Sequence, residues 1–271
     1  MTLSPQQCAQ YAADGFVKLP SLLDAEEVSV LRDEIGRLAT IEDECVFREG
    51  VDRTPKSMFR MHETDGPTAS PPFRALSRTP RVLGAAQQVL NDDALYLHHC
   101  KLNMKSAIEG SVWPWHQDFG SWHLDGIDEP HLTTLMVMLD EATELGGCLY
   151  FLPGSHKRGR VTPRWDDTTA YKFWALPPNE VSKALAEHGE PVAITGKPGD
   201  AVIFDCNLLH ASSHNLSGHD RWQVYFCFNR VANHPHDVED PRPDYVRSRN
   251  WQPMELGPDS MIIRPLTPAA E

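Results

Sequence analysis

The chain has 271 residues and a mass of 30.5 kDa, with 41% hydrophobic and 23% charged residues. This length allows one large domain with its own core, and the composition excludes wholesale disorder. The formal net charge of −13 argues against nucleic acid or an anionic membrane as the main partner, because those surfaces need dense Lys and Arg.

Targeting signals and metal-binding cysteine motifs are not evident. No apolar stretch approaches the roughly 20 residues of a membrane span. Residues 1–13 lack a basic segment followed by an apolar one, so export is not expected. The six cysteines are scattered without a Cys-x-x-Cys pair, as in proteins with reduced thiols. We therefore expect a cytoplasmic protein.

The first 94 residues predict a mainly helical portion, from N-cap residues, amphipathic periods and breaks in the pattern. Residues 40–75 show no clear period and contain several Pro, Arg and Thr, so we interpret them as a long lid loop. The expected elements, in chain order, are a helix opened by Ser4 and Pro5, a strand at 15–19, a helix from Asp24 to about Leu38, the loop at 40–75, and a helix from about Pro80 to Leu90.

From Leu95 onward, short strands alternate with Gly, Pro and Asp turns. The expected strands are about 95–105, 112–118, 131–139, 147–152, 192–195, 200–206 and 221–231, with an insertion at 155–190 that contains a short helix near 178–187. We predict one domain over residues 1–271, mainly β with flanking helices. Its core, about 95–231, is a double-stranded β-helix of jelly-roll, cupin-like type, and residues 1–94 form an N-terminal helical buttress and lid.

A candidate metal site begins with His116 and Asp118. On a strand, the period of two points both side chains to the same face. One imidazole and one carboxylate there, with a distant second histidine, form the facial triad that suits Fe(II) and leaves coordination positions open. A lone His-x-Asp is a weak signal among thirteen histidines, and His123 and Asp125 make a second copy.

The distant histidine should follow a buried strand. His210 lies just beyond the apolar run 201–206, with His214 and His219 as nearby alternatives. Arg221 opens a strand whose odd residues are polar or small and whose even residues are large and apolar. An inward arginine is costly unless it meets an anion, and a dicarboxylate cosubstrate bound to the metal would supply one.

A polar strip adds a third observation. His99, Lys101 and Asn103 share one face of the strand at 95–105, while Leu102 and Met104 share the other. In a β-barrel such a strip marks either the solvent side or a ligand-filled interior.

These residues resemble the phytanoyl-CoA dioxygenase-like group of iron/2-oxoglutarate oxygenases, most closely the ectoine hydroxylases and related amino-acid hydroxylases. The resemblance runs from about Gly15 to Pro253, nearly the whole chain. The motifs that carry it are Trp115-His116-Gln117-Asp118-Phe119, Trp122-His123, Asp125-Gly126, Gly146-Gly147, Pro153-Gly154-Ser155-His156, Gly196-Lys197-Pro198-Gly199-Asp200, Phe204-Asp205-Cys206-Asn207, and His210 with Arg221 eleven positions later.

The resemblance implies roles for individual residues. It assigns iron to His116, Asp118 and His210, and the distal carboxylate of 2-oxoglutarate to Arg221. Further cosubstrate contacts are implied at Lys101, Asn103, Ser212 and Trp122. The implied substrate contacts are His99, which is glutamine in ectoine hydroxylases, the aromatic Phe204 and Tyr225, and Arg60 of the expected lid loop, which with His99 would hold a carboxylate.

The resemblance also implies an activity. The chain is expected to use Fe(II), 2-oxoglutarate and dioxygen to hydroxylate an unactivated C–H bond of a small polar substrate, a free or modified amino acid or a compatible solute. Ectoine hydroxylases have Ser where Gln117 stands, and Phe-Glu-Thr-Trp-His where this chain has Phe119-Gly120-Ser121-Trp122-His123, so ectoine itself is not the expected substrate. The retained Asp118 argues against halogenation.

Other interpretations stay open from the sequence. The same chemistry on a larger natural-product or acyl substrate is one. A zinc hydrolase with the same three ligands is another, although it leaves Arg221 and Lys101 unexplained. The third is a catalytically silent, cupin-like binding protein. We expect a monomer or a homodimer in each case.

Overall fold

The structure is a computed structural model, and it describes residues 3–168 and 171–261. Its core consists of two antiparallel sheets, with strand orders β1-β11-β6-β13-β4-β3-β2 and β10-β7-β12-β5, and a separate β8-β9 pair. The strands are β1 (Phe16–Leu19), β2 (Val46–Glu49), β3 (Thr54–Phe59), β4 (Leu95–Lys105), β5 (Trp113–His116), β6 (Leu132–Met138), β7 (Leu149–Phe151), β8 (Arg164–Asp166), β9 (Phe173–Ala175), β10 (Val192–Ile194), β11 (Ala201–Asp205), β12 (His210–Ser212) and β13 (Arg221–Arg230). This arrangement confirms the predicted jelly-roll class.

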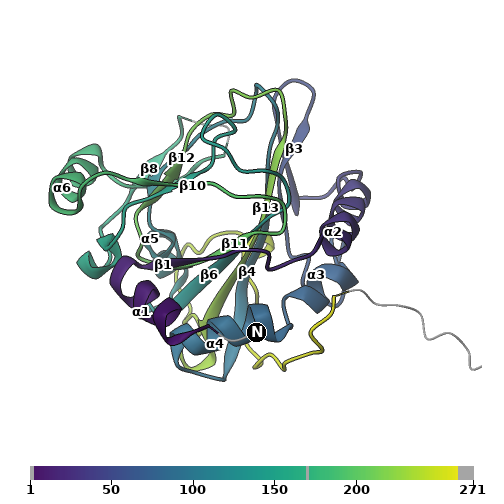
Figure 1. Ribbon diagram of the computed structural model, residues 1–271, viewed down its shortest axis with the longest axis horizontal. Coiled ribbons are helices and arrows are strands. Elements are labelled where there is room, and N and C mark those ends of the chain that lie inside the picture. Colours follow the sequence, from purple (N-terminus) through teal and green to yellow (C-terminus); the bar gives the residue numbers. More distant parts are fainter. Residues whose placement is uncertain (1–2, 169–170, 262–271) are drawn as a thin grey trace, which may run out of the picture.

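Four helices contribute residues to the core on one face of the large sheet: α1 (Pro5–Asp14), α2 (Ala25–Leu38), α3 (Pro71–Leu76) and α4 (Ala85–Leu90). The helix α5 (Asp118–Trp122) follows β5, and α6 (Pro178–His188) packs against Leu152 and Leu209. Figure 1 shows α1, α3 and α4 on one side of the large sheet and β10 and β12 on the other. No helix in the described ranges is long and apolar enough to cross a membrane.

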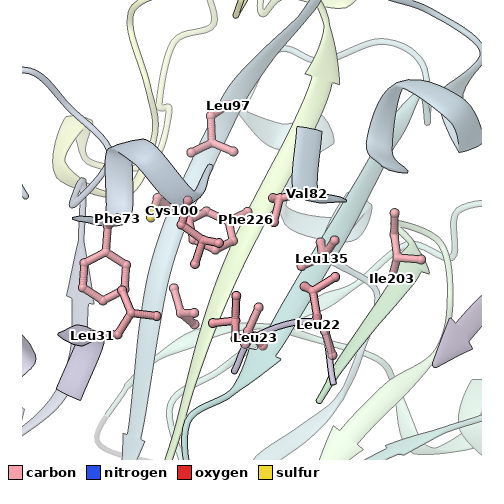
Figure 2. Packing of buried hydrophobic residues seen from close by; sticks show 14 of the residues in the cluster. Leu22, Leu23, Leu31, Phe73, Val82, Leu97, Cys100, Leu135, Ile203 and Phe226 are labelled. Atoms are coloured by element: carbon pink, nitrogen blue, oxygen red, sulfur yellow. The ribbon is translucent and has the colours of Figure 1, made fainter. Parts of the chain in front are cut away.

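The large sheet is buried on both faces. Successive side chains of β13 therefore enter two different hydrophobic cores, one on each face of the sheet. Val224, Phe226 and Phe228 pack into the core that the helices cover, together with Leu31 of α2. Figure 2 shows Phe226 in this core between Leu97 of β4 and Leu135 of β6, with Ile203 of β11 one strand further away. Tyr225 and Cys227 point the other way, into the core between the two sheets. The period of two therefore sends the polar residues of β13 and β4 toward the inside of the barrel.

The predicted helix starts are confirmed. Ser4 accepts a hydrogen bond from the backbone N–H of Gln7, and Asp24 accepts one from that of Glu27; both are completed as capping boxes. The first helix ends at Gly15, where φ is 84°. A Cβ there would lie 2.6 Å from Nδ1 of His156, so the turn into β1 needs glycine both for its backbone and for space.

The prediction of a long loop at 40–75 is wrong. The segment contains β2 and β3, which extend the large sheet beyond β4, and the helix α3. Met58 and Phe59 of β3 are completely buried and pair with Leu102 and Lys101. Pro55, which cannot donate to the sheet, obscured this short strand in the sequence.

Smaller differences concern the ends of other elements. The strand expected at 112–118 ends at His116, and Asp118 begins α5. The helix expected from Pro80 to Leu90 is present, with a π-helical turn before α4. The strand β12 and the β8–β9 pair were not predicted; the pair lies within the insertion expected at 155–190.

Candidate active site

The three predicted metal ligands come together. His116 ends β5, and His210 begins β12 directly opposite it in the antiparallel register. Asp118 Oδ1 lies 3.9 Å from His116 Nε2 and 3.8 Å from His210 Nε2. Asp118 is on a helix and not on the expected strand, but Gln117 between the two residues keeps extended dihedrals, so both side chains still point the same way.

Hydrogen bonds fix the orientation of both imidazoles. Nδ1 of His116 donates to the carbonyl of Pro114 at 2.8 Å, and Nδ1 of His210 donates to that of Leu208 at 2.9 Å. Each ring therefore turns its Nε2 toward Asp118, in the orientation that a metal ligand needs. Burial, and then the neighbouring His210, hold the pKa of His116 well below its ordinary value, which keeps this ligand neutral.

This donor set fits Fe(II). Candidate ligand atoms of the three residues all lie within 4.8 Å of one another. The hydroxyl of Thr134 donates to the second oxygen of Asp118 at 3.3 Å, which leaves the first oxygen for a metal. Two imidazoles and one carboxylate on one side of an ion leave the opposite positions open to other ligands.

The alternative ligands have other roles. His214 and His219 lie outside the cluster, and among the described residues the His-Asp-His cluster is the one group that meets the geometry of a metal site. His123 donates a hydrogen bond to the carbonyl of Ile127, and Asp125 accepts one from Arg242. The second His-x-Asp is therefore structural.

A cavity of about 500 Å³ opens beside the triad. Five residues predicted for cosubstrate or substrate line it: His99, Lys101, Asn103, Trp122 and Tyr225. The polar strip of β4 thus faces a ligand-sized interior and not solvent. Further lining residues that the sequence did not indicate are Phe47, Trp113, Tyr171, Lys172, Phe173, Trp174, Arg242 and Tyr245.

Four residues predicted for the site do not line this cavity. Phe204 is completely buried, with its ring centroid 5.3 Å from that of His210, so it supports the metal ligand from behind. Arg60 lies outside the lining and faces Glu63 at 3.8 Å. Ser212 and Arg221 lie behind the wall of the cavity.

Arg221 and Ser212 belong to a buried basic cluster with Lys105. Arg221 and Lys105 are direct partners in the β13–β4 register. Lys105 Nζ donates to Ser212 Oγ at 2.8 Å, and Arg221 Nη2 donates to the carbonyl of Gly147 at 2.9 Å. Neither cation has an ion-pair partner among the described residues, and Nε of Arg221 has no hydrogen-bond acceptor. Two adjacent buried cations of this kind fit an anionic ligand group.

The electrostatics of the cluster agree with that fit. Burial, followed by repulsion from Arg221, lowers the pKa of Lys105 to about 6. A carboxylate beside Lys105 would restore its charge. Lys105 was not predicted as a site residue, although it continues the odd-numbered strip of β4 after His99, Lys101 and Asn103.

A second charged group borders the opposite part of the cavity. Asp125 is completely buried and accepts hydrogen bonds from Nε and Nη2 of Arg242. The segment around Arg242 is also tied to β4, because Nδ1 of His99 donates to the carbonyl of Val246. Arg242 was not predicted as a site residue, because no local sequence pattern links it to Asp125.

Comparison with known proteins agrees with the fold and the site. The phytanoyl-CoA dioxygenase (PhyH) family profile matches residues 11–222. An ectoine dioxygenase of Nocardia farcinica is 32% identical over 263 residues, with 92% of this chain and 86% of the relative covered. An L-proline trans-4-hydroxylase of Streptomyces griseoviridis is 33% identical over 258 residues, which cover 90% and 92% of the two chains. A crystal structure of EctD from S. alaskensis with 2-oxoglutarate and 5-hydroxyectoine superimposes with a TM-score of 0.81 at 28% identity, and covers 96% of this chain and 89% of that one.

The jelly roll, the His-Asp-His cluster and these relatives define a 2-oxoglutarate-dependent non-haem iron dioxygenase. The matched residues span most of the chain. The chain belongs to the phytanoyl-CoA dioxygenase family.

Proposed function

We propose that the protein hydroxylates a C–H bond of a small, amino-acid-like molecule, with Fe(II) held by His116, Asp118 and His210. The observation that carries this proposal is the position of the triad on a cavity of about 500 Å³ with a buried basic cluster behind it. That volume is typical of small-molecule sites and does not favour a long acyl substrate. The cytoplasmic location and the monomeric or homodimeric state stay predictions.

The strip along β4 separates the two organic ligands. Its side chains His99, Lys101, Asn103 and Lys105 share one face, and neighbours in this series are about 6.6 Å apart along the strand. Lys105 lies beside Arg221 and Ser212, so the distal carboxylate of 2-oxoglutarate belongs at this end, with Asn103 next to it. His99 lies near Trp122 and Val246, so the substrate belongs at the other end.

Iron and 2-oxoglutarate, when bound, supply the oxidising chemistry that inserts one oxygen atom of dioxygen into a C–H bond. The residues of the chain bind, orient and exclude water. Arg221 and Lys105 bind the distal carboxylate of the cosubstrate and balance its charge. They therefore fix the position of the cosubstrate relative to the triad. Trp113, Tyr171 and Phe173 enclose the space above the triad with aromatic surface.

The end of the cavity that we assign to the substrate contains a cation, Arg242, and a neutral hydrogen-bond acceptor, His99. Since Nδ1 of His99 donates to a carbonyl, its Nε2 is left as an acceptor. Burial, and then Arg242, hold the pKa of His99 well below its ordinary value, so the ring stays neutral. Arg242 supplies a guanidinium to the same cavity. A carboxylate and an N–H group, as in an amino acid, match these two partners. The similarity to ectoine and L-proline oxygenases supports this class.

An anaerobic absorption titration tests the proposal. Apoprotein receives Fe(II) and then 2-oxoglutarate, and we expect a visible metal-to-ligand charge-transfer band in the wild type and its loss in His116→Ala. His214→Ala is the matched control, because His214 is exposed and outside the cluster. Arg221→Met should raise the half-saturating 2-oxoglutarate concentration at least tenfold without changing iron binding. No band in correctly folded wild-type protein would refute the proposal.

A further inference from the structure

Lys101 is a cation without a counter-ion in the wall of the cavity. Its ammonium makes no hydrogen bond or ion pair within the described ranges. It lies 3.7 Å from the ring centroid of Trp113, 4.8 Å from that of Tyr171 and 5.8 Å from that of Phe59. Lys101 is half-buried and its ammonium faces the cavity. Aromatic faces attract a cation, but they do not replace the hydrogen bonds that the ammonium loses when a ligand displaces water from the cavity.

The neighbouring cations are paired. Lys56 lies near the same Trp113 ring, at 5.4 Å, and forms an ion pair with Glu49 at 2.7 Å. Arg242 is held by Asp125. Lys101 has only Asp118 as a nearby carboxylate, without an ion pair, and that carboxylate is assigned to the metal. Lys101 is therefore a cation in the wall of the cavity for which the described residues supply no ion-pair partner, and the same is true of Lys105 and Arg221 behind the wall.

The wall of the cavity has an excess of positive charge. Its lining contains three cations, Lys101, Arg242 and the exposed Lys172, and one carboxylate, Asp118; the buried Asp125 behind the wall balances Arg242 and leaves the two lysines unpaired among the described residues. Lys172 also forms no ion pair in the part of the chain that the structure describes. The cosubstrate does not remove this excess, because its distal carboxylate is served by Lys105 and Arg221, four residues further along β4 and on its partner strand.

We propose that the substrate is an acidic molecule with two carboxylate groups, one bound by Arg242 and the other by Lys101. This inference rests on the proposed function, because it places a substrate in the same cavity. A dicarboxylate supplies Lys101 with the charge-assisted hydrogen bonds that it lacks. A zwitterion with one carboxylate brings one negative charge to two cations, so it can bind Lys101 or Arg242, which Asp125 already pairs, but not both. Lys101 thus becomes a specificity-determining residue for the substrate and not a contact of the cosubstrate.

The test compares acids with their neutral counterparts. Holoenzyme with Fe(II) and 2-oxoglutarate is assayed for substrate-stimulated succinate release with L-glutamate against L-glutamine, L-aspartate against L-asparagine, N-acetyl-L-glutamate, and the zwitterions ectoine and L-proline. We expect at least one acid to exceed every neutral compound tenfold or more in kcat/KM. A preference for any neutral compound, or no stimulation by any of the acids, overturns the inference.

Variants separate the substrate from the cosubstrate. Lys101→Met should lower kcat/KM for the preferred acid at least tenfold, chiefly through KM, and Lys101→Arg should restore most of it. The half-saturating 2-oxoglutarate concentration in the absorption titration should change less than threefold in Lys101→Met. Lys183→Met, at an exposed lysine of α6, is the matched control and should change neither quantity.

Two failures are distinguishable. If Lys101→Met raises the 2-oxoglutarate requirement as much as Arg221→Met does, Lys101 belongs to the cosubstrate and the inference falls while the oxygenase function stands. If wild-type holoenzyme shows no charge-transfer band, the proposed function itself fails.

Discussion

The ion pair between Asp125 and Arg242 joins two segments that are far apart in the sequence, and its removal should be costly. Asp125 is completely buried and accepts hydrogen bonds from Nε of Arg242 at 2.8 Å, from Nη2 at 2.5 Å and from the backbone N–H at 3.0 Å. Burial alone raises the pKa of Asp125, but the charge and hydrogen bonds of Arg242 hold it below its ordinary value. The carboxylate is therefore ionised and dependent on one partner.

The expected magnitude follows from this geometry. Removing one member of a buried pair leaves the other charge unpaired, which costs about 3–5 kcal/mol. The side chain of Arg242 keeps 21% of its exposure, so water relieves part of this penalty and we expect about 3 kcal/mol, or roughly 6–12 °C in Tm. Asp125→Asn, Arg242→Met and the double variant should be compared by urea unfolding at pH 7.

The double-mutant cycle decides whether the pair acts as a unit. We expect the double variant to be no less stable than either single variant, with a coupling energy of about 2 kcal/mol or more. Additive losses, with a coupling energy below about 0.5 kcal/mol, would show that each residue stabilises the fold independently and would refute this reasoning.

Three further predictions concern buried ionisable groups. Lys105→Met should raise the half-saturating 2-oxoglutarate concentration about tenfold or more in the anaerobic titration, because a charge-assisted hydrogen bond is worth about 1.5–3 kcal/mol; an unchanged value would exclude Lys105 from the site. Burial lowers the pKa of His62 and of His98 to about 3, so both are neutral in the folded state, and the stability that they contribute is present above about pH 6.5 and lost as the pH falls toward 3. His62→Gln should therefore lose less stability than the wild type between pH 7 and pH 5 in urea unfolding, and an equal loss would contradict this. Burial raises the pKa of Asp205 to about 6. Its ionised form therefore lowers the free energy of unfolding at pH 7, where the carboxylate is charged. We expect Asp205→Asn to be about 2 kcal/mol more stable than the wild type at pH 7 but not at pH 4. A less stable variant at pH 7 would show that the carboxylate is needed for another contact.

The parts of the fold that the sequence predicted correctly are those in which the cause is local. A serine or aspartate followed three residues later by Gln or Glu caps a helix through contacts within one turn, which is why α1 and α2 begin where expected. The period of two in β4 and β13 correctly grouped the side chains that share a face, because successive side chains of a strand point to opposite sides. The same alternation around Gln117 placed His116 and Asp118 together, whereas the interior position of the polar face of β4 and the choice of His210 followed from the family resemblance.

The parts that the sequence did not predict depend on distant partners. β3 is a strand because it pairs with β4, and its proline and mixed composition conceal that pairing. β12 has three residues, too few to show a period, and it exists because it bonds to β5 and β7. Arg242 reaches the cavity because a carboxylate 117 positions earlier holds it. None of these three features has a signature in the local sequence.

If the proposed assignment of β4 is correct, the order of its residues allows the substrate to change without loss of the cosubstrate. Lys105 and His99 stand at opposite ends of one polar strip, about 20 Å apart along the strand. Lys105 is packed among Ser212, Gly147 and Arg221, so we expect a change there to weaken cosubstrate binding and the reaction with it. His99 hydrogen-bonds to Val246, in the segment that contains Arg242. Substitution at the His99 end should therefore alter which molecule is oxidised, whereas the chemistry stays the same.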